Sequence, residues 1–436
     1  MIAAGGFIAK LLGALYRIPL TNLIGGHGLG LYQLVYPVYC LLLTVSATGI
    51  PASIAKLTAE RLEKGESGKP LLKSACKLFI TIGIFGTAAM ALLAPALSAA
   101  QGAKETLWGY FALAPSVALV SAISVLRGYF QGKNRMTPTA LSEVVEQAVK
   151  VGFGLLFAYL FRENVVKAVT FLLLAVSLSE AVALALMIVL YKRAERGRKK
   201  ENEGGRVAMK SILRLSIPVT FSAALLPLSG LLDSVLAVRL LGKYAPDPVA
   251  LFGLFSGGAV TIINLPVSVC YGIAAASVPA LARAVAERQK NPNGKSSVRK
   301  RLFAALGVTL LVSAPAAIGL YLFAKPAASV VFRSLQGEEL QTLVRLVRIF
   351  SVSAVTLSCV QTLSACLTAQ GKPQFAAFSM LIAVVVKTAT YAVLLKNPQI
   401  SVFGMAHATN LCYLVAFFLD LLYNLYVSKK PKQRRK

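Results

Sequence analysis

Residues 5–25 read GGFIAKLLGALYRIPLTNLIG, a stretch about long enough to cross a bilayer as one helix. Lys10 and Arg17 lie seven residues apart in it, nearly two helical turns, so both fall on one face. A charge at membrane depth is costly unless it faces water or a partner. The stretch therefore predicts a first transmembrane helix that turns a cationic face toward an internal, water-filled site.

The composition of the whole chain agrees with a membrane protein. Of its 436 residues, 56% are hydrophobic and only 14% are charged, which is too apolar for a soluble protein of this size. The apolar runs have the length of helices rather than of the short alternating strands of a barrel. The fold class predicted is an all-α polytopic membrane protein.

The apolar runs predict twelve membrane spans, at residues 2–24, 31–55, 74–100, 107–126, 138–161, 168–191, 211–241, 250–280, 302–324, 341–366, 374–395 and 402–427. With the N-terminus inside, the cytoplasmic connections carry 30 Lys and Arg residues and the opposite connections carry 7. The positive-inside rule then places both termini in the cytoplasm. We expect a multi-pass protein of the bacterial cytoplasmic membrane with no cleaved signal. The net charge of +29 reflects this orientation, and no nucleic-acid partner is expected.

An internal repeat organises the twelve spans. Residues 131–133 and 370–372 both read QGK, and Lys150 and Lys387 follow at similar distances. Because six spans are even in number, two such copies enter the membrane from the same side and form parallel repeats. The domains predicted are a six-helix lobe at 1–195, a basic linker at 196–210, a second six-helix lobe at 211–428, and a basic tail at 429–436.

Two lobes of this kind provide alternating access by rocking about a site near the midplane. Prolines weaken the helical ladder and permit bends, although they are also common in membrane helices. They concentrate in the leading pair of helices of each lobe, which we expect to move most. The predicted hinge residues are Pro19, Pro37, Pro51, Pro218, Pro266 and Pro279.

The deep cations are the predicted substrate-binding residues. Lys150 and Lys387 fall near mid-bilayer in corresponding helices, where a lysine is costly unless it lines a cavity. For Lys150 the alternative is an ion pair with Glu146, one turn earlier. For Lys10 and Arg17 the alternative is that the side chains reach the headgroup region.

The acidic residues at depth are fewer. Asp233 and Arg239 lie six residues apart in the seventh span; Arg239 is a further substrate-binding candidate. Asp233 is expected either to bind a coupling cation or proton, or to pair with Arg17. Glu143 and Glu146 add a polar stripe to the fifth span and are candidates for the same coupling or structural role. Glu180 and Asn264 are read as interhelical hydrogen-bonding groups.

The excess of deep cations favours an anionic substrate group such as phosphate or pyrophosphate. No nucleotide-binding loop, nucleophile–base set or metal-ligand spacing occurs in the sequence, so we expect neither an enzyme nor a bound cofactor. Transport would then be coupled to the membrane potential or to a cation gradient. The six cysteines read as small buried hydrophobic residues.

Several motifs resemble one bacterial family. They are KLLGALYRIP at 10–19, IG at 24–25, GLYQ at 30–33, YP at 36–37, TGIP at 48–51, AKL at 55–57 and RGYFQGK at 127–133. Together they resemble the SpoVB/YtgP group of polysaccharide biosynthesis membrane proteins, within the multidrug/oligosaccharidyl-lipid/polysaccharide (MOP) exporter superfamily. The resemblance covers nearly the whole chain and is most specific in the first sixty residues.

This resemblance implies a flippase that moves an undecaprenyl-linked sugar, such as the cell-wall precursor lipid II, to the outer leaflet for cell-wall or spore-cortex synthesis. MurJ-type members hold the pyrophosphate with basic residues of helix one; Lys10 matches such a position, and Arg17 does so with a one-residue offset. Such members also carry arginines in helices two and eight, where this sequence has none. Many members have fourteen helices, the last pair forming a lipid-tail groove, which we do not expect within these twelve spans.

The partners implied are the lipid-linked oligosaccharide and membrane lipids, and a monomer is compatible with the two-lobed plan. The main alternative is a MATE-type, cation-coupled multidrug antiporter, which would need acidic residues facing its cavity. A major-facilitator transporter is less favoured because its loop motif between helices two and three is missing from residues 56–73. A non-transporting assembly protein is a further alternative.

Overall fold

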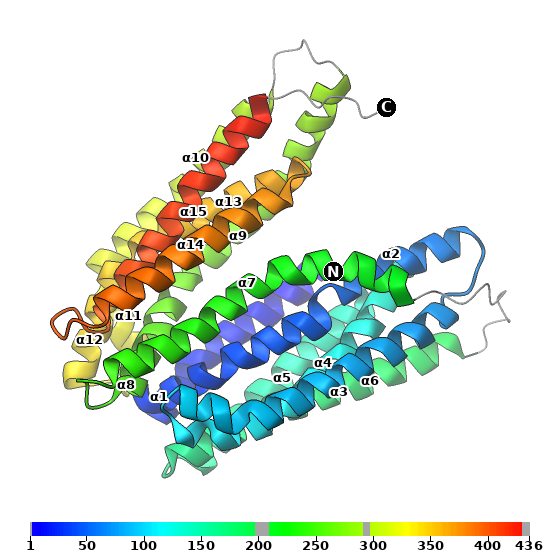
Figure 1. Ribbon diagram of the computed structural model, residues 1–436. Coiled ribbons are helices and arrows are strands. Elements are labelled where there is room, and N and C mark those ends of the chain that lie inside the picture. The colour runs from blue at the N-terminus through cyan, green and yellow to red at the C-terminus, as the bar shows by residue number, and fades with distance from the viewer. Residues whose placement is uncertain (1, 197–208, 291–296, 430–436) are drawn as a thin grey trace. The chain divides into compact units, whose positions relative to one another are not determined.

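The computed structural model describes residues 2–196, 209–290 and 297–429, which form helices and no strand (Figure 1). Side chains near the start of α1 and α7 and in part of α9 are not described. The chain divides into two compact units, residues 1–235 and 236–436.

The first unit is a bundle of long helices that run side by side (Figure 1). Its elements are α1 (Ile2–Leu43), a π-helical segment η1 (Thr44–Thr48), α2 (Ile50–Glu63), α3 (Lys69–Ala100), a 3₁₀ turn η2 (Lys104–Thr106), α4 (Leu107–Gly132), α5 (Thr137–Leu160), α6 (Val165–Glu195) and the larger part of α7 (Met209–Leu241). The second unit contains α8 (Pro248–Gly253), a π-helical segment η3 (Leu254–Ala259), α9 (Val260–Lys290), α10 (Ser297–Leu322), α11 (Ala324–Val331), α12 (Gly337–Phe350), α13 (Val352–Ala369), α14 (Pro373–Leu394) and α15 (Phe403–Lys429).

The predicted fold class is confirmed, and every predicted span falls on a helix. The first two spans share α1, whose backbone turns non-helical at Gly25 (φ 67°, ψ −173°), a conformation that favours glycine. The tenth span is shared by α12 and α13. In the described part of the chain, ten helical segments are long and apolar enough to cross a membrane.

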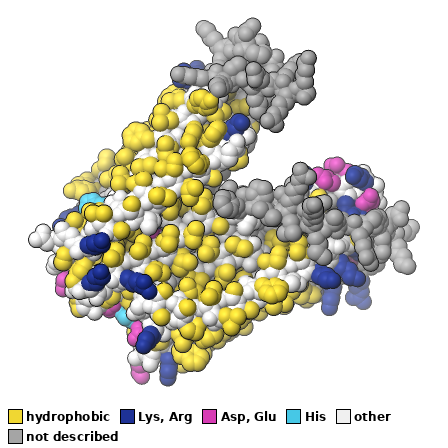
Figure 2. All heavy atoms as spheres, in the orientation of Figure 1, with side chains coloured by type: hydrophobic (Ala, Val, Ile, Leu, Met, Phe, Trp, Pro, Cys, Tyr) yellow, Lys and Arg dark blue, Asp and Glu magenta, His cyan; other side chains and the backbone are white. Residues whose placement is uncertain are grey.

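The surface fits a bilayer. Figure 2 shows hydrophobic side chains over most of the visible face, with Lys and Arg gathered largely toward the ends of the helices. Large apolar side chains stay exposed along the middle of several helices, among them Phe85, Leu92 and Leu311. Such exposure is expected where lipid rather than water surrounds the protein.

The two QGK motifs occupy matching places in their units. Each lies at the end of one helix and bonds to the last helix of its own repeat. Lys133 pairs with Glu195 of α6 at 2.5 Å, and the Gln370 side-chain amide donates to Asn424 of α15 at 2.7 Å. In both copies of the sequence repeat, the QGK motif therefore lies at the end of a helix and is bonded to a later helix.

The compact units do not divide where the sequence repeat does. The structural boundary at residues 235 and 236 lies inside α7, whereas the repeat predicts a second lobe from residue 211. The predicted linker at 196–210 and tail at 429–436 fall mostly outside the described residues. The division into lobes at those positions stays a prediction.

Candidate intramembrane sites

Glu180 of α6 lies at the centre of a polar cluster inside the first unit. Its side chain is buried, and the Tyr39 hydroxyl from α1 donates to Glu180 Oε1 at 2.5 Å. The Ser116 hydroxyl of α4 also bonds to Glu180. Glu146 and Lys150 on α5 are near enough to interact electrostatically with the Glu180 carboxyl group. Four helices therefore meet at one carboxyl within the hydrophobic span.

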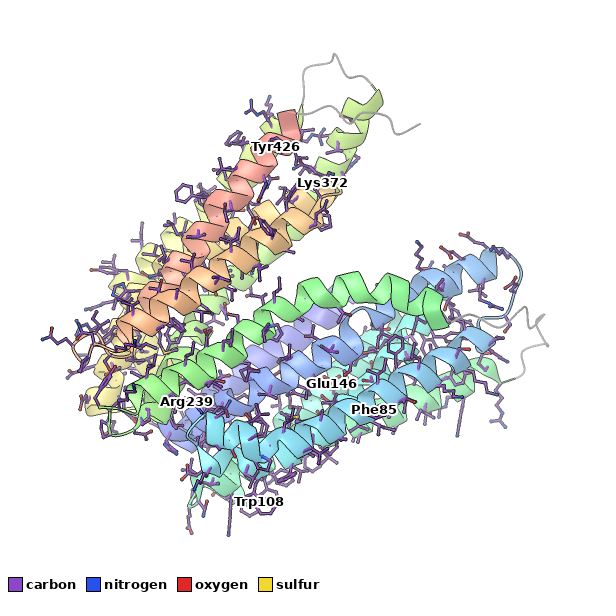
Figure 3. The ribbon with its side chains drawn as sticks, viewed as in Figure 1. Phe85, Trp108, Glu146, Arg239, Lys372 and Tyr426 are labelled. Carbon is purple, nitrogen blue, oxygen red and sulfur yellow. The ribbon has the colours of Figure 1, made fainter. Side chains whose placement is uncertain are left out.

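A second part of this cluster is an ion pair between α4 and α5. Arg127 Nη2 lies 2.9 Å from Glu146 Oε2, and Arg127 Nε donates to the Ser142 hydroxyl, also at 2.9 Å. Both charged side chains are largely buried, at 15% and 20% exposure. Glu146 lies among the helices of the first unit in Figure 3. Arg127, which the sequence reasoning did not select as a site residue, is therefore the cross-helix partner of Glu146.

The other predicted site residues of the first unit are less buried than Glu180 or have side chains that are not described. Lys150, Glu143 and Asp233 are each partly buried on α5 or α7. The side chains of Lys10 and Arg17 lie outside the described residues, so their predicted contact with an anion stays a prediction.

In the second unit, Lys387 is buried in the middle of α14, with 6% exposure. Its Nζ lies 5.5 Å from the ring centre of Tyr391, within the range of a cation–π contact. The Tyr391 hydroxyl in turn lies 2.9 Å from the Thr409 hydroxyl of α15. Arg239, by contrast, is exposed near the end of α7 (Figure 3).

A polar network between α13, α14 and α15 was missed by the sequence reasoning. Asp420 is 1% exposed, and its Oδ2 accepts from the Ser364 hydroxyl at 2.7 Å. The Ser379 hydroxyl lies against the same carboxyl. One turn later, the fully buried Asn424 donates to the Leu363 carbonyl at 3.0 Å. The spacing of Asp420 and Asn424, four residues apart in an apolar helix, is the signal that could have found them.

The predicted hinge prolines lie at several kinds of position. Pro19 and Pro37 are inside α1, while Pro51 is in the first turn of α2, just after the π-helical segment η1. Pro266 lies inside α9, which follows the π-helical segment η3. The side chains of Pro218 and Pro279 lie outside the described residues. The second span of each repeat thus contains an irregular turn, and motion at these prolines stays a prediction.

Comparison with known proteins agrees with this architecture. A family model described as "Polysaccharide biosynthesis protein" matches residues 1–285, and a MatE model matches residues 218–393. Stage V sporulation protein B of Bacillus subtilis (strain 168) is 27% identical over 420 residues, covering 94% of this chain and 79% of that protein. Lipid II flippase MurJ of the same organism is 23% identical over 458 residues, covering 99% and 81%.

Solved structures show the same fold. An inward-facing multidrug resistance MATE family transporter of the MOP superfamily has a TM-score of 0.80 at 17% identity, covering 97% of this chain and 96% of that one. Lipid II flippase MurJ in an inward closed conformation has a TM-score of 0.73 at 14% identity, covering 98% and 90%. The resemblance seen in the sequence motifs is confirmed. The chain belongs to the polysaccharide biosynthesis protein family.

Proposed function

We propose that the protein is a flippase that moves an undecaprenyl-pyrophosphate-linked oligosaccharide across the bacterial cytoplasmic membrane by alternating access. Lipid II is the leading candidate substrate. Two of its sequence relatives are a sporulation protein and a lipid II flippase, each matched over most of its length. The same relationship supports a transporter rather than an enzyme.

The observation that carries this proposal is the buried cation Lys387 in α14. An ammonium group in the hydrocarbon region is costly unless it faces water or a polar or anionic group, and the anionic group of a substrate is one such partner. Phosphate groups are common partners of lysine. A buried cation would instead repel a cationic drug, so Lys387 favours a phosphate-bearing substrate over the substrates of a multidrug exporter.

The second candidate is a MATE-type, cation-coupled multidrug antiporter. It is favoured by the buried carboxyls Glu180 and Asp420, which are the residue type such an exporter needs. Fold similarity alone does not distinguish the two functions, because both MATE and MurJ structures match the whole chain. The substrate therefore has to be decided by experiment.

Complementation separates these functions. The full chain would be expressed in a bacterium depleted of its own lipid II flippase, where the proposal predicts restored growth. Lys387→Met and Arg17→Ala are expected to fail although present in the membrane at wild-type amounts. Lys396→Met, at an exposed lysine just beyond α14, is the matched control and is expected to restore growth. A well-expressed wild-type chain that gives no growth would contradict lipid II transport, and drug resistance gained in the same strain would support the antiporter.

A further inference from the structure

Asp420 is a buried carboxyl in the interior of the second unit. It lies nine residues before the end of α15 at Lys429, about 14 Å along the helix axis at ~1.5 Å per residue. Its side chain is 1% exposed and is enclosed by α13, α14 and its own helix. An isolated carboxylate at such a depth is strongly disfavoured.

The hydrogen bonds around Asp420 leave one of its oxygens incomplete. Oδ2 accepts from Ser364 at 2.7 Å, whereas Oδ1 is fully buried and makes no hydrogen bond of normal geometry with the described residues. Ser379 lies against the carboxyl, but its hydroxyl donates to the Phe375 carbonyl at 2.9 Å. A hydroxyl has a single proton to donate, so Ser379 offers only lone pairs to Asp420. A proton on the carboxyl group would let it donate an O–H···O hydrogen bond to the Ser379 hydroxyl.

No basic side chain balances this carboxyl. Within the described residues, Asp420 makes no ion pair. The protonation of its carboxyl group depends on its burial and on the Ser364 and Ser379 hydroxyls. None of the other titratable groups described on the helices packed around it forms an ion pair or a hydrogen bond with its carboxyl group. They are Arg299, Lys300, Arg301 and Tyr321 on α10, Glu338, Glu339, Arg345 and Arg348 on α12, Cys359 and Cys366 on α13, Lys387 and Tyr391 on α14 with Lys372 at its start, and His407, Cys412, Tyr413, Tyr423 and Tyr426 on α15 itself.

The acidic residue near the QGK motif of the first unit differs from Asp420 in having basic partners. There the last helix of the repeat presents Glu195 to the QGK motif, and this carboxylate pairs with Lys133 at 2.5 Å and Lys69 at 3.2 Å. In the second unit the bond to the motif comes from its first residue, Gln370, to the neutral Asn424, and the acid lies one turn deeper. The acid of the second unit is therefore the one without a basic partner.

We propose that Asp420 is a proton-binding site of the transport cycle: it carries a proton in the packing seen here and releases it when α14 and α15 move apart. This inference rests on the proposed transport function. Loss of the proton would leave a negative charge on the Asp420 carboxylate. The lone pairs of this carboxylate and of the Ser379 hydroxyl oxygen would then face each other. The stacked rings of Phe375 and Tyr423, 4.7 Å apart, lie between the same two helices and would separate with them.

The set of oxygens favours a proton over a metal cation. Among the described residues, the side chains seen to contact the carboxyl are Ser364 and Ser379, and the nearby Asn424 Oδ1 already accepts from Gln370. The described residues contain no group of three or more His, Cys, Asp or Glu side chains that could hold a metal ion. A proton needs only the oxygens that are present.

Infrared difference spectroscopy on the purified full chain tests this site without any substrate. The wild type is expected to show the carbonyl stretch of a protonated carboxylic acid that disappears as the pH is raised. Glu180→Gln removes the buried carboxyl of the first unit and should retain a titrating band that arises from Asp420. In this Glu180→Gln background, adding Asp420→Asn should abolish the band, and the protein should still fold because an amide can accept from Ser364 and donate to Ser379. Loss of every titrating band in Glu180→Gln alone, or a titrating band that persists in the double variant, would overturn the proposal.

Transport in proteoliposomes supplies the second readout. With lipid II as the probe, an imposed pH gradient should change the wild-type flipping rate, and Asp420→Asn should flip at the same rate with and without the gradient. A wild-type rate that follows a sodium gradient and ignores the pH gradient would overturn the coupling role. Absence of flipping by every variant, with the infrared band intact, would contradict the proposed substrate and leave the proton site standing.

Discussion

Gly132 is the described glycine of the first unit at which an added methyl group would come nearest to the backbone of a neighbouring helix. Gly128 and Gly132 lie four residues apart on α4 and form a small-residue face against α2. A Cβ at Gly132 would lie 2.5 Å from Thr58 Cβ and 2.6 Å from the Ala55 carbonyl oxygen. The carbonyl belongs to the backbone of α2 and cannot rotate away, so Gly132→Ala must push the two helices apart.

The size of the effect follows from two opposing terms. Overpacking a close contact costs about 1–3 kcal/mol, while Gly→Ala inside a helix gains up to about 1 kcal/mol. The gain is small at Gly132 because it is the last residue of α4. We expect Gly132→Ala to lower the free energy of unfolding by about 1–2 kcal/mol. Gly152→Ala on α5 is the matched control, since its Cβ would meet nothing within 4 Å.

The assay is thermal unfolding of the full chain in detergent, followed with a dye that reacts with cysteines as they become exposed. Cys270, Cys359, Cys366 and Cys412 form no disulfide and are buried, so they report the loss of packing in the second unit, and Cys76 on α3 reports on the first. Gly132→Ala should melt several degrees below wild type, and Gly152→Ala at or above it. Equal melting of the two variants would refute the close contact between α2 and α4.

Two further perturbations test the charges. Arg127→Met leaves Glu146 buried without its partner and should cost about 3 kcal/mol of stability, much of it recovered by adding Glu146→Met; full additivity of the two changes would argue against the pair. Glu339 is exposed, and partial desolvation, followed by the charge of Asp247, raises its pKa in the folded protein. Its ionisation therefore opposes folding as the pH rises through the range between its unfolded and folded pKa values. Glu339→Gln should therefore raise the melting temperature at neutral pH and change it little in acid, whereas an equal gain at both pH values would contradict this assignment.

The sequence alone was sufficient for the helices, since each predicted span falls on a helix and the break after residue 24 falls at Gly25. Periodicity and length decide such features locally. The burial of Lys387 could also be anticipated, because its depth follows from its position in the span. These predictions needed only distances along the chain.

Partners between helices could not be predicted in the same way. Glu146 has a lysine one turn away in sequence, and the structure pairs it with Arg127, nineteen residues distant on another helix. Asp420 was not selected from the sequence, and the packing of α13 and α14 shows that it is enclosed. The RGYFQGK motif supported the family resemblance, but its role in the close approach of α4 to α2 required coordinates.

The most direct test of the transport function is lipid II flipping by the purified protein in proteoliposomes. We predict that the wild-type protein moves lipid II between leaflets and that Lys396→Met does the same. Lys387→Met should be correctly folded and move it at a rate near that of empty vesicles. Equal flipping by Lys387→Met and wild type, or transport of a cationic drug with no movement of lipid II, would contradict the account.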